Sequence, residues 1–190
     1  MSDNSWIIAA VDISAEEAPE RAKIVREWLI AEGIVEREIS DSVLGGDGGH
    51  SPGRNYAAAV KPEWVQKVQA GNYSFPRLRT NGVAFITGRT VFDAGGNGIE
   101  LQCRFCGSVF VPDESWSDAA GLWYDGDDRV RFPCPSCVER TLLTEWGSPW
   151  PWAFGNLGVE FWNWPPLSET FIRAVSEKLG RRTVVVRLHL

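Results

Sequence analysis

The chain has 190 residues, of which 44% are hydrophobic and 23% charged, a composition typical of soluble globular proteins. Its net charge of −6 at pH 7 argues against non-specific binding to nucleic-acid phosphates, because that attraction grows with lysine and arginine. No apolar run reaches the ~20 residues that span a bilayer. The first residues lack the basic start of an export signal, so we expect a cytoplasmic protein with no membrane contact.

The first half of the chain predicts a strand and a helix, then irregular structure, then a second helix and strand. Residues 6–11 form a short apolar run typical of a buried strand. Helical spacing follows, with Ser14 expected as N-cap and Gly33 as C-cap. Gly-rich residues 45–53 predict a flexible loop. A helix over 61–70, a loop over 72–82 and a strand over 83–87 come next, and residues 90–92 are expected to extend or follow that strand.

All four cysteines lie in two Cys-x-x-Cys pairs, and strand-like runs precede and follow each pair. Four thiolates in this spacing are the usual ligands of a structural zinc ion. The sequence therefore predicts a zinc ribbon over residues 99–144. The expected metal ligands are Cys103, Cys106, Cys134 and Cys137.

Three other uses of these cysteines remain open from the residues alone. The spacing also resembles that of rubredoxins, which hold iron, although Val138 replaces the glycine that usually follows the second pair there. Disulfides would suit a secreted chain. The pair Cys134–Cys137 would suit a thioredoxin-like redox site, but that leaves the other pair unexplained.

The last third of the chain is rich in tryptophan and predicts a strand, a helix and a strand. A Trp/Pro stretch over 146–152 precedes a strand over 157–162. A helix capped by Ser168 and ended by Gly180 leads to a strand over 183–188. With the ribbon set aside, the order β-α-β, β-α-β predicts a ferredoxin-like α+β sandwich made of residues 1–98 and 145–190.

A set of motifs is spread over most of the chain: Trp6-Ile7-Ile8, Val91 to Asn97, both cysteine pairs, the Trp/Pro stretch, Glu160-x-x-Asn163 and the closing helix and strand to His189. Together they resemble a family of uncharacterised bacterial proteins that often carry the label "sugar ABC transporter ATPase". The resemblance leaves out residues 34–80, which we expect to be an insertion. An ABC ATPase needs Gly-x-x-x-x-Gly-Lys-Ser/Thr, and the nearest run, Gly82 to Thr90, has the wrong length and Arg89 for lysine, so no ATPase is expected.

Two further patterns have a structural interpretation that we favour. Gly49-x-Ser51-x-Gly53 matches a hydrolase nucleophile elbow, but Pro52 lacks the N–H that an oxyanion hole requires. The lone His50 and His189 are expected in packing or at the surface. Aromatic residues between positions 146 and 164 are expected to pack the ribbon onto the sandwich, with Trp162 and Trp164 on one face and Phe161 on the other, although an exposed binding platform is the alternative.

The leading functional hypothesis is a non-enzymatic protein that binds a protein partner, as an adaptor or an immunity-like protein, with zinc in a structural role. No residue is assigned to catalysis or to an organic cofactor. One alternative is an enzyme with a site between ribbon and sandwich that uses Arg77, Arg79 or Arg89 with Ser51 or Asp93. Another is nucleic-acid binding through the ribbon, which its acidic residues oppose.

Overall fold

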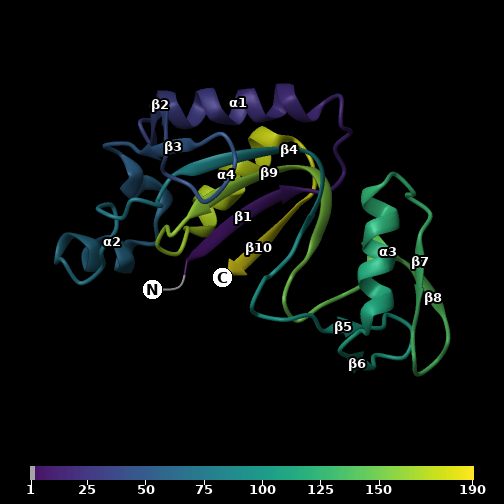
Figure 1. The fold of residues 1–190 in the computed structure, drawn as a ribbon. Helices are drawn as coiled ribbons and strands as arrows, with labels where there is room; N and C mark the ends of the chain where they lie inside the picture. The colour runs from purple at the N-terminus through teal and green to yellow at the C-terminus, as the bar shows by residue number, and fades with distance from the viewer. Residues whose placement is uncertain (1–2) are drawn as a thin grey trace.

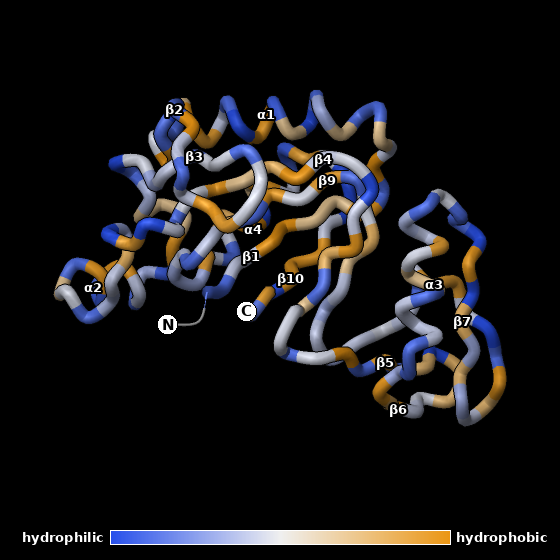
Figure 2. The backbone as a smooth tube through the Cα atoms, in the orientation of Figure 1, coloured by the Kyte–Doolittle hydropathy of each residue, from blue (hydrophilic) through white to orange (hydrophobic). Residues whose placement is uncertain are grey.

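The computed structural model describes residues 3–190 and has a mixed α+β architecture built on one six-stranded sheet (Figure 1). The strand order is β10-β1-β9-β4-β3-β2, and each neighbouring pair runs antiparallel. In Figure 2 the apolar stretches of the paired strands β1 and β10 lie side by side. The six strands are β1 (Asn4–Ala10), β2 (Val35–Ser40), β3 (Gly49–Pro52), β4 (Val83–Phe92), β9 (Ala153–Trp162) and β10 (Thr183–His189).

Two helices, α1 (Ala18–Ala31) and α4 (Glu169–Leu179), pack together against one face of the sheet and enclose the main core. Helix α4 begins and ends as predicted: the Ser168 hydroxyl accepts from the Phe171 N–H, and Gly180 has φ 64°. Helix α1 begins later than predicted, at Ala18. Ser14 instead forms a preceding turn, in which its hydroxyl accepts from the Glu17 N–H.

Residues 34–80 extend the sheet and close one end of the main core. They contribute strands β2 and β3, a short 3₁₀ turn (Tyr56–Ala59) and helix α2 (Pro62–Gln69), and Phe75 is buried in the core. The predicted helix and loop in this segment are confirmed. The predicted loop over 45–53 is wrong in its second half, because Gly49–Pro52 pairs with both β2 and β4.

Phe161 and Trp164 share the main core, while Trp162 lies on the opposite face of the sheet and lines a pocket there. The prediction that Trp162 and Trp164 share a face is therefore wrong. The alternation fails because β9 ends at Trp162 and Asn163 has a left-handed backbone, φ 54°. The side chain of Asn163 holds this turn by hydrogen bonds to Asp3 and Thr80.

The chain between β4 and β9 forms a separate lobe beside the sheet (Figure 1). Its two short hairpins flank helix α3 around their own apolar cluster, which includes Trp116, Trp123 and Phe132. None of the helices in residues 3–190 combines the length and the apolar character needed to cross a bilayer. The lobe elements are β5 (Leu101–Gln102), β6 (Val109–Phe110), α3 (Glu114–Tyr124), β7 (Arg131–Pro133), β8 (Arg140–Leu142) and a 3₁₀ turn (Leu143–Glu145).

Candidate metal centre

The four cysteines of the lobe converge on one point. One pair lies in the turn between β5 and β6, and the other lies in the turn between β7 and β8. All four Sγ atoms lie within 4.8 Å of one another. The Cys103 and Cys137 sulfurs are 3.8 Å apart, and those of Cys106 and Cys134 are 3.7 Å apart. Sulfurs bonded at ~2.3 Å to one tetrahedral ion have separations of this size.

The two turns share one hydrogen-bond pattern, although their sequences differ. The N–H of Gly107 donates to the Cys103 carbonyl at 2.9 Å, and the N–H of Val138 donates to the Cys134 carbonyl at 2.9 Å. Gly107 has φ 72° and Val138 has φ 57°, so both adopt the left-handed conformation. That conformation is cheap for glycine and strained for a β-branched residue. The second turn therefore carries backbone strain that the first does not.

Replacing Val138 with glycine should relieve this strain. The left-handed backbone costs a non-glycine residue ~1–2 kcal/mol, and glycine loses part of that gain through its extra unfolded-state freedom. We expect V138G to stabilise the lobe by about 1 kcal/mol, measured as a roughly fivefold tighter zinc affinity in a chelator competition. The reciprocal change Gly107→Val should weaken zinc binding. Equal zinc affinity of the V138G and Gly107→Val variants would contradict a cost from backbone strain at Val138.

The Ser108 hydroxyl lowers the pKa of two of the thiols. It lies 3.2 Å from the Cys106 sulfur and 3.5 Å from the Cys134 sulfur. Hydrogen bonding to this hydroxyl is the main cause that lowers the pKa of Cys106, and it lowers the pKa of Cys134 to about 6. Despite a backbone hydrogen bond at Glu139, burial and contacts with the other thiols raise the pKa of Cys137 to about 12. Several thiolates this close repel one another unless a cation lies between them.

The donor set fits a structural metal ion better than the alternatives. All four cysteines are free thiols, and the shortest sulfur separations far exceed the ~2.05 Å of a disulfide. Cys134 follows a strand and does not begin a helix, as a thioredoxin-like redox pair would require. Cys103 and Cys134 are buried, and both pairs contribute to the same cluster. Four thiolates would fill a tetrahedral shell and leave no position for a reactive water molecule.

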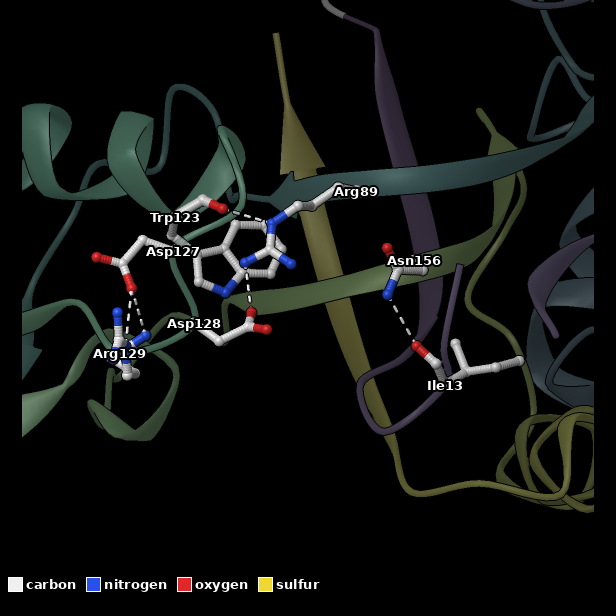
Figure 3. Close-up of polar contacts among 7 residues, drawn as sticks. All are labelled: Ile13, Arg89, Trp123, Asp127, Asp128, Arg129 and Asn156. Atoms are coloured by element: carbon white, nitrogen blue, oxygen red, sulfur yellow. Dashed lines mark hydrogen bonds and ion pairs between the residues drawn. The ribbon is translucent and has the colours of Figure 1, made fainter. Parts of the chain in front are cut away.

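A cleft of about 670 Å³ separates the lobe from the sheet. Its walls carry tryptophan rings and five charged side chains, each of which has a partner of opposite charge within the protein. Asn156 on β9 donates to the Ile13 carbonyl at 2.8 Å and fixes the wall opposite the lobe (Figure 3). The cleft is thus lined by aromatic rings, and each of its charged side chains is paired.

The residues proposed for an enzyme site do not meet in this cleft. Of the set, only Arg89 lines it. The exposed Arg79 pairs with Asp41, the Ser51 hydroxyl bonds that of Ser40, and the Asp93 carboxylate accepts from the Gly95 N–H.

The other sequence motifs outside the cysteine cluster are structural. Gly82 to Thr90 lies at and within strand β4, where no phosphate-binding turn and helix follow. Gly49 to Gly53 runs through strand β3, which rules out a strand-turn-helix nucleophile elbow there. His50 is buried with Nδ1 3.0 Å from the Glu36 carbonyl, and His189 Nδ1 is 2.7 Å from Asn4 Oδ1.

Arg89 connects the sheet to the lobe. It projects from β4 within the register shift between Thr87 and Thr90, and its guanidinium lies 3.9 Å from the centre of the Trp123 ring. The same group donates to the Trp123 carbonyl and to Asp128 at 2.5 Å (Figure 3). With 24% of its side chain exposed, Arg89 is partly shielded from water, which strengthens these contacts.

Arg89→Ala should therefore loosen the lobe, by about 1–2 kcal/mol for a partly buried charged donor. Faster hydrogen exchange at the C-terminal end of α3 would report this loss. The variant Arg89→Lys should not restore protection from hydrogen exchange, because lysine lacks the planar guanidinium with its several N–H donors. Arg129→Ala is the matched control, since that side chain is 94% exposed and its ion pair with Asp127 is long, at 3.8 Å (Figure 3). Equal exchange in the Arg89 and Arg129 variants would refute the role of Arg89.

The aromatic residues of the Trp/Pro region divide between two cores. Phe154, Trp146 and Trp152 pack with the lobe cluster, as the prediction of a seal between lobe and sheet requires. Phe161 and Trp164 belong to the main core, and Trp150 is 46% exposed. Because Trp150 is the one exposed tryptophan between positions 146 and 164, these rings do not form an exposed binding platform.

One buried acidic residue was missed as a candidate. Glu160 appeared in the sequence only as part of a motif, and the structure places it 6% exposed on β9. Burial raises the pKa of Glu160, and hydrogen bonds from Ser5 and Trp162 partly offset the rise. No local pattern predicts this, because Ser5 is 155 positions away in the sequence.

Comparison with known proteins gives no family: neither family models, nor curated proteins, nor solved structures match the chain.

Proposed function

We propose that the protein is a zinc-stabilised binding protein whose lobe is a zinc ribbon and whose larger part is a ferredoxin-like sandwich. The convergence of four thiols on one point supports a ribbon held by Cys103, Cys106, Cys134 and Cys137. For the sandwich, the antiparallel order β10-β1-β9-β4 is the one that two interleaved β-α-β units produce. Membership of the bacterial family with the shared motifs is part of the same proposal.

The zinc has a structural role in this proposal. A lobe confined to residues 99–144 is short for an independent hydrophobic core, and each of its hairpins has only two short strands. The metal would hold the two hairpins together and fix the surface between them. Because a four-thiolate shell is closed, the ion itself would not activate water. Free thiols clustered in this way favour a reducing compartment, so we propose a cytoplasmic location.

The observation that carries the binding function is the exposure of apolar side chains around the metal site. Phe105, Val109 and Val138 are 54%, 50% and 78% exposed, and each lies within three residues of a cysteine ligand. Because the four sulfurs converge, the two cysteine turns lie together at one end of the lobe. We call the three exposed side chains on and beside these turns the knuckle surface. Exposed apolar groups held on a rigid support are typical of protein interfaces.

The charge of the lobe indicates the chemistry of the partner. Residues 99–144 contain eight aspartates and glutamates but only four arginines. The acidic balance of the lobe as a whole favours a basic protein partner and opposes nucleic acid. We therefore propose an adaptor or immunity-like role toward one basic protein. An enzyme that uses the cleft is the second candidate, and the observation that favours it is the size of the cleft, about 670 Å³.

The test is a comparison of matched variants in binding to an identified partner. Wild-type protein, a Phe105→Ser/Val109→Ser variant and an Ile39→Ser control would be immobilised and exposed to lysate of the source cell. A protein captured by wild type would be purified, and its affinity for all three measured. Ile39 is 63% exposed on β2, so its replacement removes apolar surface far from the knuckles.

We expect the captured partner to be basic and its affinity to fall at least tenfold in the Phe105/Val109 variant, with the zinc content unchanged. The Ile39 control should bind like wild type. Capture of no protein, or equal affinity of all three forms for the partner, would rule out the knuckle surface as the interface.

A further inference from the structure

A second pocket lies on the sheet face opposite α1 and α4. None of the four cysteines lines it. Its volume is about 430 Å³, within the range of small-ligand sites. Strands β4 and β9 form the floor, and residues 43–48 of the β2–β3 connection form the wall above them. Ala84 stands directly opposite Glu160 in the register of these strands, so a small side chain leaves space beside the carboxylate.

Glu160 is the polar group at the floor of this pocket. The Ser5 hydroxyl, itself fully buried, donates to Glu160 Oε1 at 2.6 Å. Trp162 lines the same pocket and supplies an aromatic wall. A carboxylate can accept about four hydrogen bonds, so acceptor capacity remains for a ligand. The Ser5 hydroxyl holds the side chain in place, and no cationic group within residues 3–190 forms an ion pair with it.

The charge of the lining is one-sided. Glu160 lies at the floor and the exposed Asp47 lies in the wall, while no lysine, arginine or histidine among residues 3–190 lines the pocket. At Gly45 and Gly46 in the wall, no atom lies within 4 Å of the position that a Cβ would occupy, so this part of the wall is thin and open. A buried carboxylate without an opposing charge is costly, and a bound cation would offset that cost.

We propose that this pocket binds the guanidinium or ammonium group of an organic cation, with Glu160 as its counter-ion and Trp162 as its aromatic wall. The two carboxylates supply attraction, and the Trp162 ring supplies cation–π stabilisation. Calcium or magnesium fits less well, because each needs six or more oxygen ligands and Glu160 is the one buried carboxylate of this pocket. The site is independent of the zinc and of the knuckle surface.

The probes for this site are Nα-acetyl-arginine methylamide, propylguanidinium and the uncharged isostere Nα-acetyl-citrulline methylamide. Backbone amide resonances of the zinc-loaded protein would be followed during titration with each compound. We expect saturable shifts at residues 43–48 and 158–162 with both guanidinium compounds and none with the citrulline analogue. Tighter binding of the capped arginine would indicate a protein side chain as the natural source, and tighter binding of propylguanidinium would indicate a free small molecule.

Two variants test the site independently, so that if one of them fails to fold the other still provides the test. Glu160→Gln removes the charge at nearly constant shape, and Ala84→Leu fills the space beside a retained carboxylate. Each should weaken the capped arginine at least tenfold, while Glu177→Gln, which removes an exposed carboxylate on α4, should not. Equal binding of the citrulline analogue, unchanged affinity in both pocket variants, or no saturable shift at these residues would overturn the proposal. Loss of binding at the knuckle surface would leave this result unaffected.

Discussion

Replacing Cys134 with serine should weaken zinc binding strongly and unfold the lobe while the sheet remains folded. Cys134 is 1% exposed, and its sulfur lies 3.7 Å from that of Cys106. A structural zinc ion contributes an apparent ~10–16 kcal/mol to small domains, so loss of one of four ligands should weaken zinc at least ~1,000-fold, or about 4 kcal/mol. Metal analysis and chelator competition measure the affinity, and hydrogen exchange shows which part of the chain opens.

Ser136→Ala is the control for that change. It lies between the same two cysteines, and it supplies no sulfur to the cluster. We expect it to retain one zinc ion per chain with protection of α3 unchanged. Full zinc content in the Cys134 variant, or unfolding of the sheet together with the lobe, would contradict the assignment of a separate, metal-dependent lobe.

Trp116→Ala is the second change expected to have a large effect, a destabilisation of the lobe by about 3–5 kcal/mol. Trp116 is 2% exposed at the centre of the lobe cluster. Its ring lies 5.2 Å from that of Phe132 within the lobe and 6.2 Å from that of Phe154 on β9. The substitution therefore removes packing inside the lobe and packing between the lobe and the sheet.

Leu122→Ala is the matched control on the same helix, since Leu122 is 58% exposed. It should change the free energy of unfolding of the lobe by less than about 0.5 kcal/mol. Chelator-induced unfolding followed by hydrogen exchange at α3 compares the two variants. Similar stability of both would mean that the aromatic cluster does not hold the lobe.

The parts of the structure that sequence predicted are those specified by neighbouring residues. Cys-x-x-Cys spacing brings two sulfurs together locally, and Ser168 and Gly180 mark the ends of α4 through bonds within one turn. The antiparallel sheet and its two covering helices follow from apolar runs and helical spacing. These features need no information about distant contacts.

The parts that sequence missed depend on distant partners or on rare backbone conformations. Strand β2 has one buried residue in six and alternates little, because it lies at the edge of the sheet. Its partner β3 begins in glycine, which favours a loop until β4 supplies hydrogen bonds. Trp164 reached the main core because Asn163 adopts φ 54°, a conformation that strand periodicity does not anticipate.

The same limit applies to the candidate sites. The clustering of Cys103, Cys106, Cys134 and Cys137 was predictable, but the strain at Val138 appears only in the folded turn. The pocket at Glu160 requires the register of β4 against β9 and the path of the β2–β3 connection. Binding sites built from several strands are therefore the features for which the structure added most.

X-ray absorption at the zinc edge of the purified protein tests the central claim most directly. The account predicts one zinc ion per chain with four sulfur neighbours at ~2.3 Å and no nitrogen or oxygen ligand. A protein without stoichiometric metal, or an absorption spectrum requiring mixed sulfur and oxygen ligands, would contradict a closed four-cysteine centre and with it the structural role of the ion.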